Sequence, residues 1–164
     1  MITDDLLTID NVWQKMTPEL QDEVRHFWQT NEIYLPQDEA IRRSKEIDFI
    51  ARNVEGSIIG VSSVRRIFIQ RMNNYFYYYR AMIDFLHRRK RIAVRLTHET
   101  QDYFERQFIE GKDRSCIGLY TIYENQALNI GVRKVISPKT KFIFLGYNAQ
   151  GKQMRVYYFK GAEI

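Results

Sequence analysis

The chain has 164 residues, of which 45% are apolar, and this is enough to bury a sizeable core in one domain. The single cysteine, Cys116, excludes an internal disulfide framework and any metal site built from several cysteines, and the three histidines lack metal-binding spacing. The N-terminus is acidic, and no apolar run approaches the roughly 20 residues that cross a bilayer. We therefore expect one cytoplasmic domain over residues 1–164, with no metal ion and no membrane contact.

The positive charge is concentrated in one stretch of the sequence. Lysine and arginine number 25 against 20 aspartate and glutamate residues. Residues 85–98 contain five of these cations and no carboxylate, so the remainder of the chain sums to neutral. Residues 99–110 then hold four carboxylates and one arginine. This distribution predicts one local site for phosphates or carboxylates rather than a basic coating over the whole surface.

The first half of the chain predicts a strand, helices and a hairpin. In the first long helix Thr17 is the expected N-cap and Pro18 suits the first helical position. Gly56 suits the turn of the hairpin. The elements expected in chain order are a strand at 6–9, a helix at 13–34, one or two helical turns at 37–46, strands at 47–51 and 57–64, and a continued strand or loop at 65–73.

The second half is dominated by an aromatic segment at residues 74–83, which predicts a central strand covered on both faces. Alternation places Tyr75, Tyr77 and Tyr79 on one face, and we interpret this run as core packing in preference to base stacking. A helix at 92–109 follows, then a strand at 116–123, a short helix or loop, and a hairpin of strands at 141–147 and 154–159. The order predicts an α/β fold whose mixed, mostly antiparallel sheet of six or seven strands is flanked by helices.

A strand that ends at Ile83, a turn rich in cations and an amphipathic helix that begins at Ile92 form a unit that favours anions, because a helix N-terminus presents unpaired N–H groups. This segment resembles the acyl-coenzyme A (CoA) binding motif of the GCN5-related N-acetyltransferases, in which a central strand leads through Arg/Gln-x-x-Gly-x-Gly/Ala into a helix. Arg88 matches the first position of the motif and Ala93 matches the last. The resemblance extends more loosely over most of the chain.

The resemblance implies an enzyme that uses acetyl-CoA, or another acyl-CoA, as cosubstrate and transfers the acyl group to an amine that attacks the thioester directly. Backbone N–H groups from Arg89 to Val94 would surround the pyrophosphate. The pantetheine would lie in an opening between the strand that ends at Ile83 and the strand at 116–123. The implied cofactor-binding residues are Met82, Ile83, Arg88, Arg89, Lys90, Arg91, Ile92, Ala93 and Val94.

Two positions depart from the family pattern. Arg91 stands where the family has its middle glycine, and we expect it to adopt ordinary helical dihedrals and to reach a phosphate with its long side chain. Asn125 matches an asparagine that the family often carries, but the residue seven positions later is Val132 and not the tyrosine that protonates the leaving thiolate. The sequence therefore assigns no catalytic acid and does not identify the acceptor amine.

Other interpretations of the same residues stay open. The cations at 88–91 also fit a solvated basic turn or a less favoured nucleic-acid site. An inactive module of the same fold would engage nucleic acid or a protein through residues 88–95. Glu124 is interpreted as a solvated carboxylate in preference to a general base, and Cys116 as a small buried residue in preference to a nucleophile.

Overall fold

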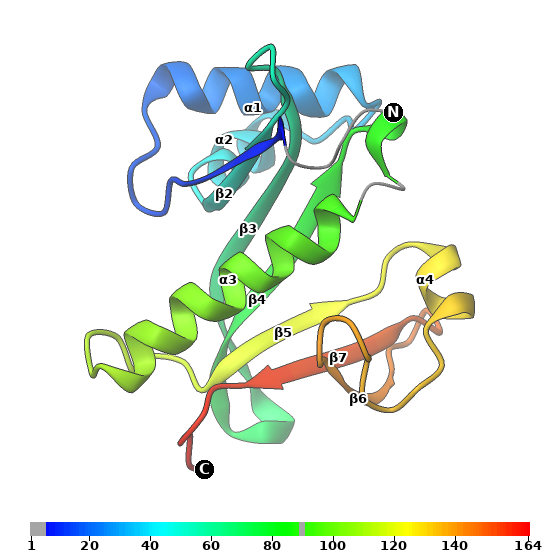
Figure 1. Ribbon diagram of the computed structural model, residues 1–164. Coiled ribbons are helices and arrows are strands. Elements are labelled where there is room, and N and C mark those ends of the chain that lie inside the picture. The colour runs from blue at the N-terminus through cyan, green and yellow to red at the C-terminus, as the bar shows by residue number, and fades with distance from the viewer. Residues whose placement is uncertain (1–5, 89–90) are drawn as a thin grey trace. The chain divides into compact units, whose positions relative to one another are not determined.

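The computed structural model describes residues 6–88 and 91–164 (Figure 1). The strands form a seven-stranded sheet in the order β1-β2-β3-β4-β5-β7-β6. The pair β4 and β5 is parallel. Strand β2 is antiparallel to both β1 and β3, and strand β7 is antiparallel to both β5 and β6. This confirms the expected mixed, mostly antiparallel sheet. The elements are β1 (Thr8–Asn11), α1 (Pro18–Thr30), α2 (Gln37–Ser44), β2 (Ile47–Arg52), β3 (Ile58–Ile69), β4 (Asn74–Ile83), α3 (Ile92–Ile109), β5 (Gly118–Ile122), α4 (Gln126–Gly131), β6 (Ile143–Tyr147) and β7 (Gln153–Tyr158).

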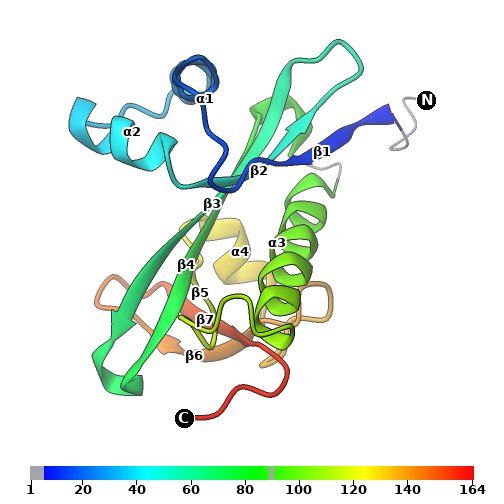
Figure 2. The same cartoon turned by 90° about the vertical axis from the view of Figure 1, so that its left-hand side faces the viewer.

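The described residues fall into two compact units. Unit 1 comprises Met1–Val64 and Ala81–Thr100, and unit 2 comprises Arg65–Arg80 and Gln101–Ile164. The strands β3 and β4, which run side by side in Figure 2, and the helix α3 each begin in one unit and end in the other. The single domain expected over residues 1–164 stays a prediction.

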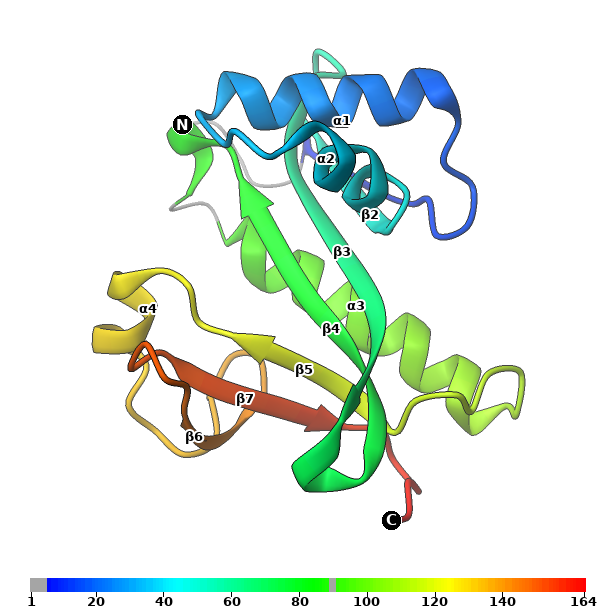
Figure 3. The same cartoon turned by 180° about the vertical axis from the view of Figure 1, so that it is seen from behind.

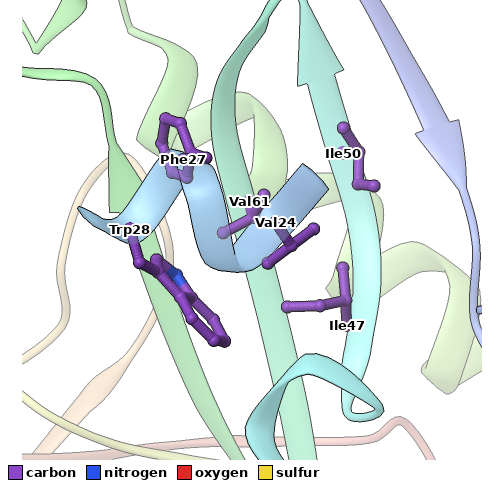
Figure 4. Close-up of a cluster of buried hydrophobic side chains, with 6 residues drawn as sticks. All are labelled: Val24, Phe27, Trp28, Ile47, Ile50 and Val61. Carbon is purple, nitrogen blue, oxygen red and sulfur yellow. The ribbon is translucent and has the colours of Figure 1, made fainter. Parts of the chain in front are cut away.

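In unit 1, the N-cap of α1 is as expected but the helix is shorter. Thr17 accepts a hydrogen bond from the Leu20 amide at 3.2 Å, and Pro18 is the first helical residue. The prediction of a start at Trp13 is wrong, because the Lys15 amide closes a turn onto the Val12 carbonyl at 2.9 Å. The helix ends at Thr30 rather than at residue 34. Its apolar face packs on β2 and β3 in a core of Val24, Phe27, Trp28, Ile47, Ile50 and Val61 (Figure 4).

The first turns of α3 are fixed against β2 and β3 within unit 1. Gly60 of β3 is in close contact with α3, because an added Cβ there would lie 3.2 Å from Ile92 Cγ2 and 3.3 Å from Leu96 Cδ1. Asp48 of β2 is fully buried, and its two carboxylate oxygens accept hydrogen bonds of 2.6 Å from Ser62 Oγ and Thr100 Oγ1. Packing and the hydrogen bond from Thr100 together hold the part of α3 that belongs to unit 1 against the sheet.

In unit 2, one face of β4 is buried and the other is only partly covered. Tyr77 and Tyr79 are buried, and their rings contact Phe104 of α3 at 4.5 Å and Phe142 at 6.3 Å. The central position of β4 is confirmed. The expected cover on both faces is only partly present, because Phe76 on the second face is fully buried while the residues that follow it on that face are less covered. Tyr78 and Arg80, which alternation places on the opposite face, are both half-buried.

The loop between α4 and β6 is held by a buried cation of unit 2. Arg155 of β7 is 1% exposed and donates to the carbonyls of Val132, Lys134, Val135 and Phe142, at 3.0 to 3.5 Å, and to Gln153 Oε1 at 2.8 Å. Its guanidinium also lies 5.2 Å from the centre of the Tyr123 ring. This one side chain therefore joins β7 to four carbonyls of residues 132–142.

The two units differ in charge, which corrects the expectation of a single basic locality. Unit 2 contains 14 lysine and arginine residues and six carboxylates. Residues 56–83 and 125–162 contain no carboxylate at all, so cations such as Arg66, Arg71 and Lys139 are not balanced nearby in sequence. The charges outside residues 85–98 sum to zero although unit 2 is positive, because most of the acids that balance its cations lie in unit 1.

Candidate phosphate-binding turn

The end of β4 leads into a turn that is held at several points. The Asp84 amide donates to the Ile59 carbonyl at 2.8 Å, and the Phe85 amide donates to Asn31 Oδ1 at 3.0 Å. The Asp84 side chain caps a single 3-10 turn, Phe85–His87, by accepting from the Leu86 amide at 3.1 Å. The same carboxylate lies 2.7 Å from His87 Nδ1. The chain therefore leaves the sheet in a defined direction.

Arg91 adopts the left-handed conformation, with φ of 57°. The expectation of ordinary helical dihedrals at this residue is wrong, because Arg91 lies just outside α3 and has a positive φ. The Arg95 amide already donates to the Arg91 carbonyl at 3.0 Å, so the helix follows at once. A left-handed conformation costs a residue with a Cβ about 1–2 kcal/mol, whereas glycine adopts it freely. The backbone thus has the conformation that glycine favours, although the residue is arginine.

The first turn of α3 presents its backbone amides outside the sheet. The N–H groups of Ile92, Ala93 and Val94 precede the first bond of the helix and have no partner within it. The Ile92 side chain is buried and holds the start of the helix in the core, whereas the next residue, Ala93, is exposed to solvent. The positive end of the helix dipole lies here as well, which favours an anion.

The side chains around this turn are cationic and exposed. Arg88, Arg91 and Arg95 are exposed, and Arg88 Nε donates to the Ile83 carbonyl at 3.5 Å. The nearest carboxylate in sequence, Asp84, is already engaged by the Leu86 amide and His87. Phe85, which is 71% exposed, lies 5.4 Å below the Arg88 guanidinium. The electrostatic field at the start of α3 is therefore positive.

The structure brings most of the expected site residues to this end of unit 1. Ile83 is buried beside Gly60, and Met82 packs against the core cluster of α1, so only their main chains are available to a ligand. Arg89 and Lys90 lie outside the described residues. Sequence reasoning missed Asn31, whose role at Phe85 depends on a contact 54 residues away along the chain.

The position at which the family carries its tyrosine is Val132, in unit 2. Asn125 caps α4 by accepting from the Ala127 amide at 2.7 Å, and Val132 follows the last turn of that helix. Glu124 forms an ion pair with Lys152, as suits a surface carboxylate. Burial raises the pKa of the Cys116 thiol to about 12, so it stays protonated and is a poor nucleophile. The catalytic acid remains unassigned.

Over residues 6–88 and 91–164 no group of three histidine, cysteine or acidic side chains is placed to hold a metal ion. Within that part of the chain, none of the helices combines the length and apolar composition needed to cross a bilayer.

Comparison with known proteins identifies the fold. No protein-family model matches the chain, and no curated protein sequence matches it significantly. Solved structures do match. They include a GNAT-family N-acetyltransferase (YhbS) of Escherichia coli in complex with CoA, with a TM-score of 0.63 and 13% identity over 94% of this chain and 82% of that one.

Two further matches cover nearly the whole length of both chains. The ribosomal-protein-S5-alanine acetyltransferase of Vibrio fischeri has a TM-score of 0.62 and 11% identity over 98% of this chain and 97% of that one. NAA60 of Arabidopsis thaliana in complex with acetyl-CoA has a TM-score of 0.60 and 12% identity over 93% and 99%. Identities this low establish architecture rather than activity. The chain has the fold of the GCN5-related N-acetyltransferases.

Proposed function

We propose that the protein binds acetyl-CoA, or a related acyl-CoA, in the cytoplasm and transfers the acyl group to an amine. The observation that carries the proposal is the left-handed Arg91 immediately before the first three residues of α3, whose amides have no acceptor within the helix. That backbone path is the one that the glycine of the family motif favours. Structural neighbours crystallised with CoA or acetyl-CoA support the same ligand.

The proposed site uses backbone groups for position and arginines for charge. The pyrophosphate would accept hydrogen bonds from the amides of residues 89–94, at the positive end of the α3 dipole. Arg88 and Arg91 would add charge-assisted contacts from either side of the loop. The main chains of Met82 and Ile83 would contact the pantetheine, since their side chains are committed to the core.

The proposed reaction is acyl transfer by direct attack. The amine nitrogen forms a bond to the thioester carbonyl carbon, the carbon–sulfur bond breaks, and the proton lost by the amine ends on the CoA sulfur. The protein would supply proximity and polarisation of the carbonyl by main-chain groups. Because position 132 is valine, that proton reaches sulfur without a tyrosine donor there, and we expect slow turnover.

Isothermal titration calorimetry with acetyl-CoA tests the proposal. We expect one binding site, about fivefold weaker binding for Arg88→Ala after screening of an exposed charge, and similar or slightly weaker binding for Arg91→Gly. Arg133→Ala, which removes an exposed arginine of unit 2, is the matched control and should bind as the wild type does. An absence of binding at millimolar acetyl-CoA would overturn the proposal, and a large gain for Arg91→Gly would show that the arginine obstructs the loop.

The valine at position 132 favours one second candidate, a module that keeps the fold without the transferase chemistry and engages nucleic acid or a protein through residues 88–95. Release of free CoA thiol from acetyl-CoA in the presence of a panel of amines separates the two. Amine-dependent release supports the transferase, whereas acetyl-CoA binding without release under any amine supports the module.

A further inference from the structure

The sheet of unit 2 has a face opposite α3 on which partly exposed tyrosines gather. Contacts to α3 define the covered face, since Tyr157 Oη donates to Glu105 of that helix at 3.1 Å and Tyr77 packs on Phe104. Alternation and strand register put the neighbouring residues of β4, β5 and β7 on the other face. Figure 3 shows β5 and β7 from this side, with no helix laid across them. We define the tyrosine face by Tyr78, Arg80, Tyr120 and Tyr158.

Ring contacts confirm that these side chains share one surface. The rings of Tyr78 and Tyr120 are 5.7 Å apart, and Tyr158 lies 6.0 Å from the buried ring of Phe76. The Arg80 guanidinium lies 4.3 Å above the Tyr78 ring. Tyr158 is 40% exposed, and Tyr78, Arg80 and Tyr120 are half-buried. The face therefore combines aromatic rings with a guanidinium stacked on one of them.

Carboxylates are absent from the strands that form this face. Neither β3, β4, β5 nor β7 contains aspartate or glutamate. Four of the six acids of unit 2 have partners elsewhere. Glu105 accepts from Tyr157 and Asp113 accepts from Tyr77. Glu110 and Glu124 form ion pairs with Lys112 and Lys152. Arg66 of β3 stacks on Tyr75 of the α3 side, with its guanidinium 3.7 Å from the ring centre. By alternation the preceding residue, Arg65, lies on the opposite side and adds a second half-buried cation to the tyrosine face. An anionic partner thus meets no repulsion from these strands.

The chemistry of the face selects among possible occupants. A second copy of this chain would bring together two units that each carry 14 cations against six carboxylates, which opposes self-association. An acidic peptide would form ion pairs with the arginines but would offer no planar group to stack on the tyrosine rings. Single-stranded nucleic acid satisfies both, since its phosphates pair with arginine and its bases stack on aromatic rings.

We propose that the tyrosine face binds single-stranded nucleic acid, with bases stacked on Tyr158 and its neighbours and phosphates paired with Arg80 and Arg65. The tyrosine face uses residues of unit 2, whereas the turn before α3 uses residues of unit 1, so this binding does not depend on the acyl-CoA proposal. Two phosphate contacts predict a slope of log affinity against log salt of about −1.4, which is about a sevenfold loss between 50 and 200 mM salt.

Fluorescence anisotropy of the full chain with a labelled 15-nucleotide dT strand tests this. We expect Tyr158→Leu, which keeps apolar cover over Phe76, to weaken binding at least about fivefold, because stacking carries a large share of single-strand affinity. Tyr158→Phe should bind as the wild type does. Tyr75→Leu is the matched control, as Tyr75 is also 40% exposed but shares the α3 side of β4 with Tyr77. Arg80→Ala should reduce the salt slope by about 0.7.

Competition distinguishes this site from the turn before α3. Excess CoA should leave the oligonucleotide bound, and Arg88→Ala should leave its affinity unchanged. Displacement by CoA would place the strand at the phosphate turn and overturn the proposal. Equal effects of Tyr158→Leu and Tyr75→Leu would also overturn it. Polyglutamate that competes as well as a strand of equal charge would overturn it in favour of an acidic protein partner.

Discussion

Asp48 in unit 1 and Arg155 in unit 2 are both buried ionisable side chains, and they are satisfied in different ways. Asp48 has two hydroxyl donors, Ser62 and Thr100, and burial raises its pKa from 3.8 to about 6. Arg155 has five hydrogen bonds to carbonyl and amide oxygens and cannot be deprotonated. The carboxyl group of Asp48 can be neutralised by binding a proton, whereas the guanidinium of Arg155 stays charged and needs the carbonyl acceptors that the surrounding loop supplies. We expect unit 1 to respond to pH and unit 2 to respond to mutation.

The largest expected effect is the loss of Arg155. Arg155→Met keeps much of the apolar volume but leaves the carbonyls of Val132, Lys134, Val135 and Phe142 without this donor. Gln153 Nε2 still donates to Val132, and the amides of Phe144 and Ser137 still donate to Val135 and Phe142. The acceptors that lose their donor are therefore the Lys134 carbonyl and Gln153 Oε1. At about 1–3 kcal/mol for each buried acceptor left unpaired, we expect a loss on the order of 4 kcal/mol in the free energy of unfolding. Urea denaturation measures it. The exposed Arg133→Met should change stability by less than about 0.5 kcal/mol, and equal losses in both variants would refute the role of Arg155.

The second effect is a pH dependence that originates at Asp48. Between about pH 4 and 6 the folded state holds a proton on this carboxyl that the unfolded state has released. The contribution of Asp48 to the free energy of unfolding is therefore fully present below about pH 4 and is lost as the pH rises through about 6. At 1.36 kcal/mol per pKa unit the loss approaches about 3 kcal/mol by pH 7. Denaturation of the wild type and Asp48→Asn across this range isolates the contribution, because Glu23 and Asp113, whose pKa values are lowered, titrate in both proteins. Parallel profiles for the two proteins would contradict it.

The smallest effect concerns one of the two donors to Asp48. Thr100→Val keeps the shape of the side chain but removes the hydroxyl that donates at 2.6 Å, which should raise the pKa of Asp48 further. We expect a loss of about 1–2 kcal/mol at pH 7 and a smaller loss at pH 4, where the carboxyl is largely protonated. Thr97→Val, on the same helix, removes a hydroxyl bonded to the Ala93 carbonyl and should show no such difference between pH values. A loss for Thr100→Val that is equal at both pH values would count against the coupling.

The sequence predicted features that depend on local patterns and missed features that depend on contacts between residues far apart in the chain. The bounds of β4 and α3 were predicted to the residue, because an aromatic run and a long apolar stripe report burial directly. The left-handed Arg91 was not predictable from its residue type, since the usual marker of that conformation is glycine. The burial of Arg155 was not predictable either, because the carbonyls that accept its hydrogen bonds belong to residues 13 to 23 positions earlier in the chain.

The most direct test of the account is whether a CoA phosphate meets the first amides of α3. A titration of the ¹⁵N-labelled protein with CoA, followed by amide chemical shifts in two-dimensional NMR spectra, measures this at single residues. We predict the largest shifts at Ile92, Ala93 and Val94, which lack partners within the helix, and little change at Ala127, whose amide is already bonded to Asn125 Oδ1 at the start of α4. Shifts that saturate with CoA but leave residues 92–94 unmoved would contradict the proposed site.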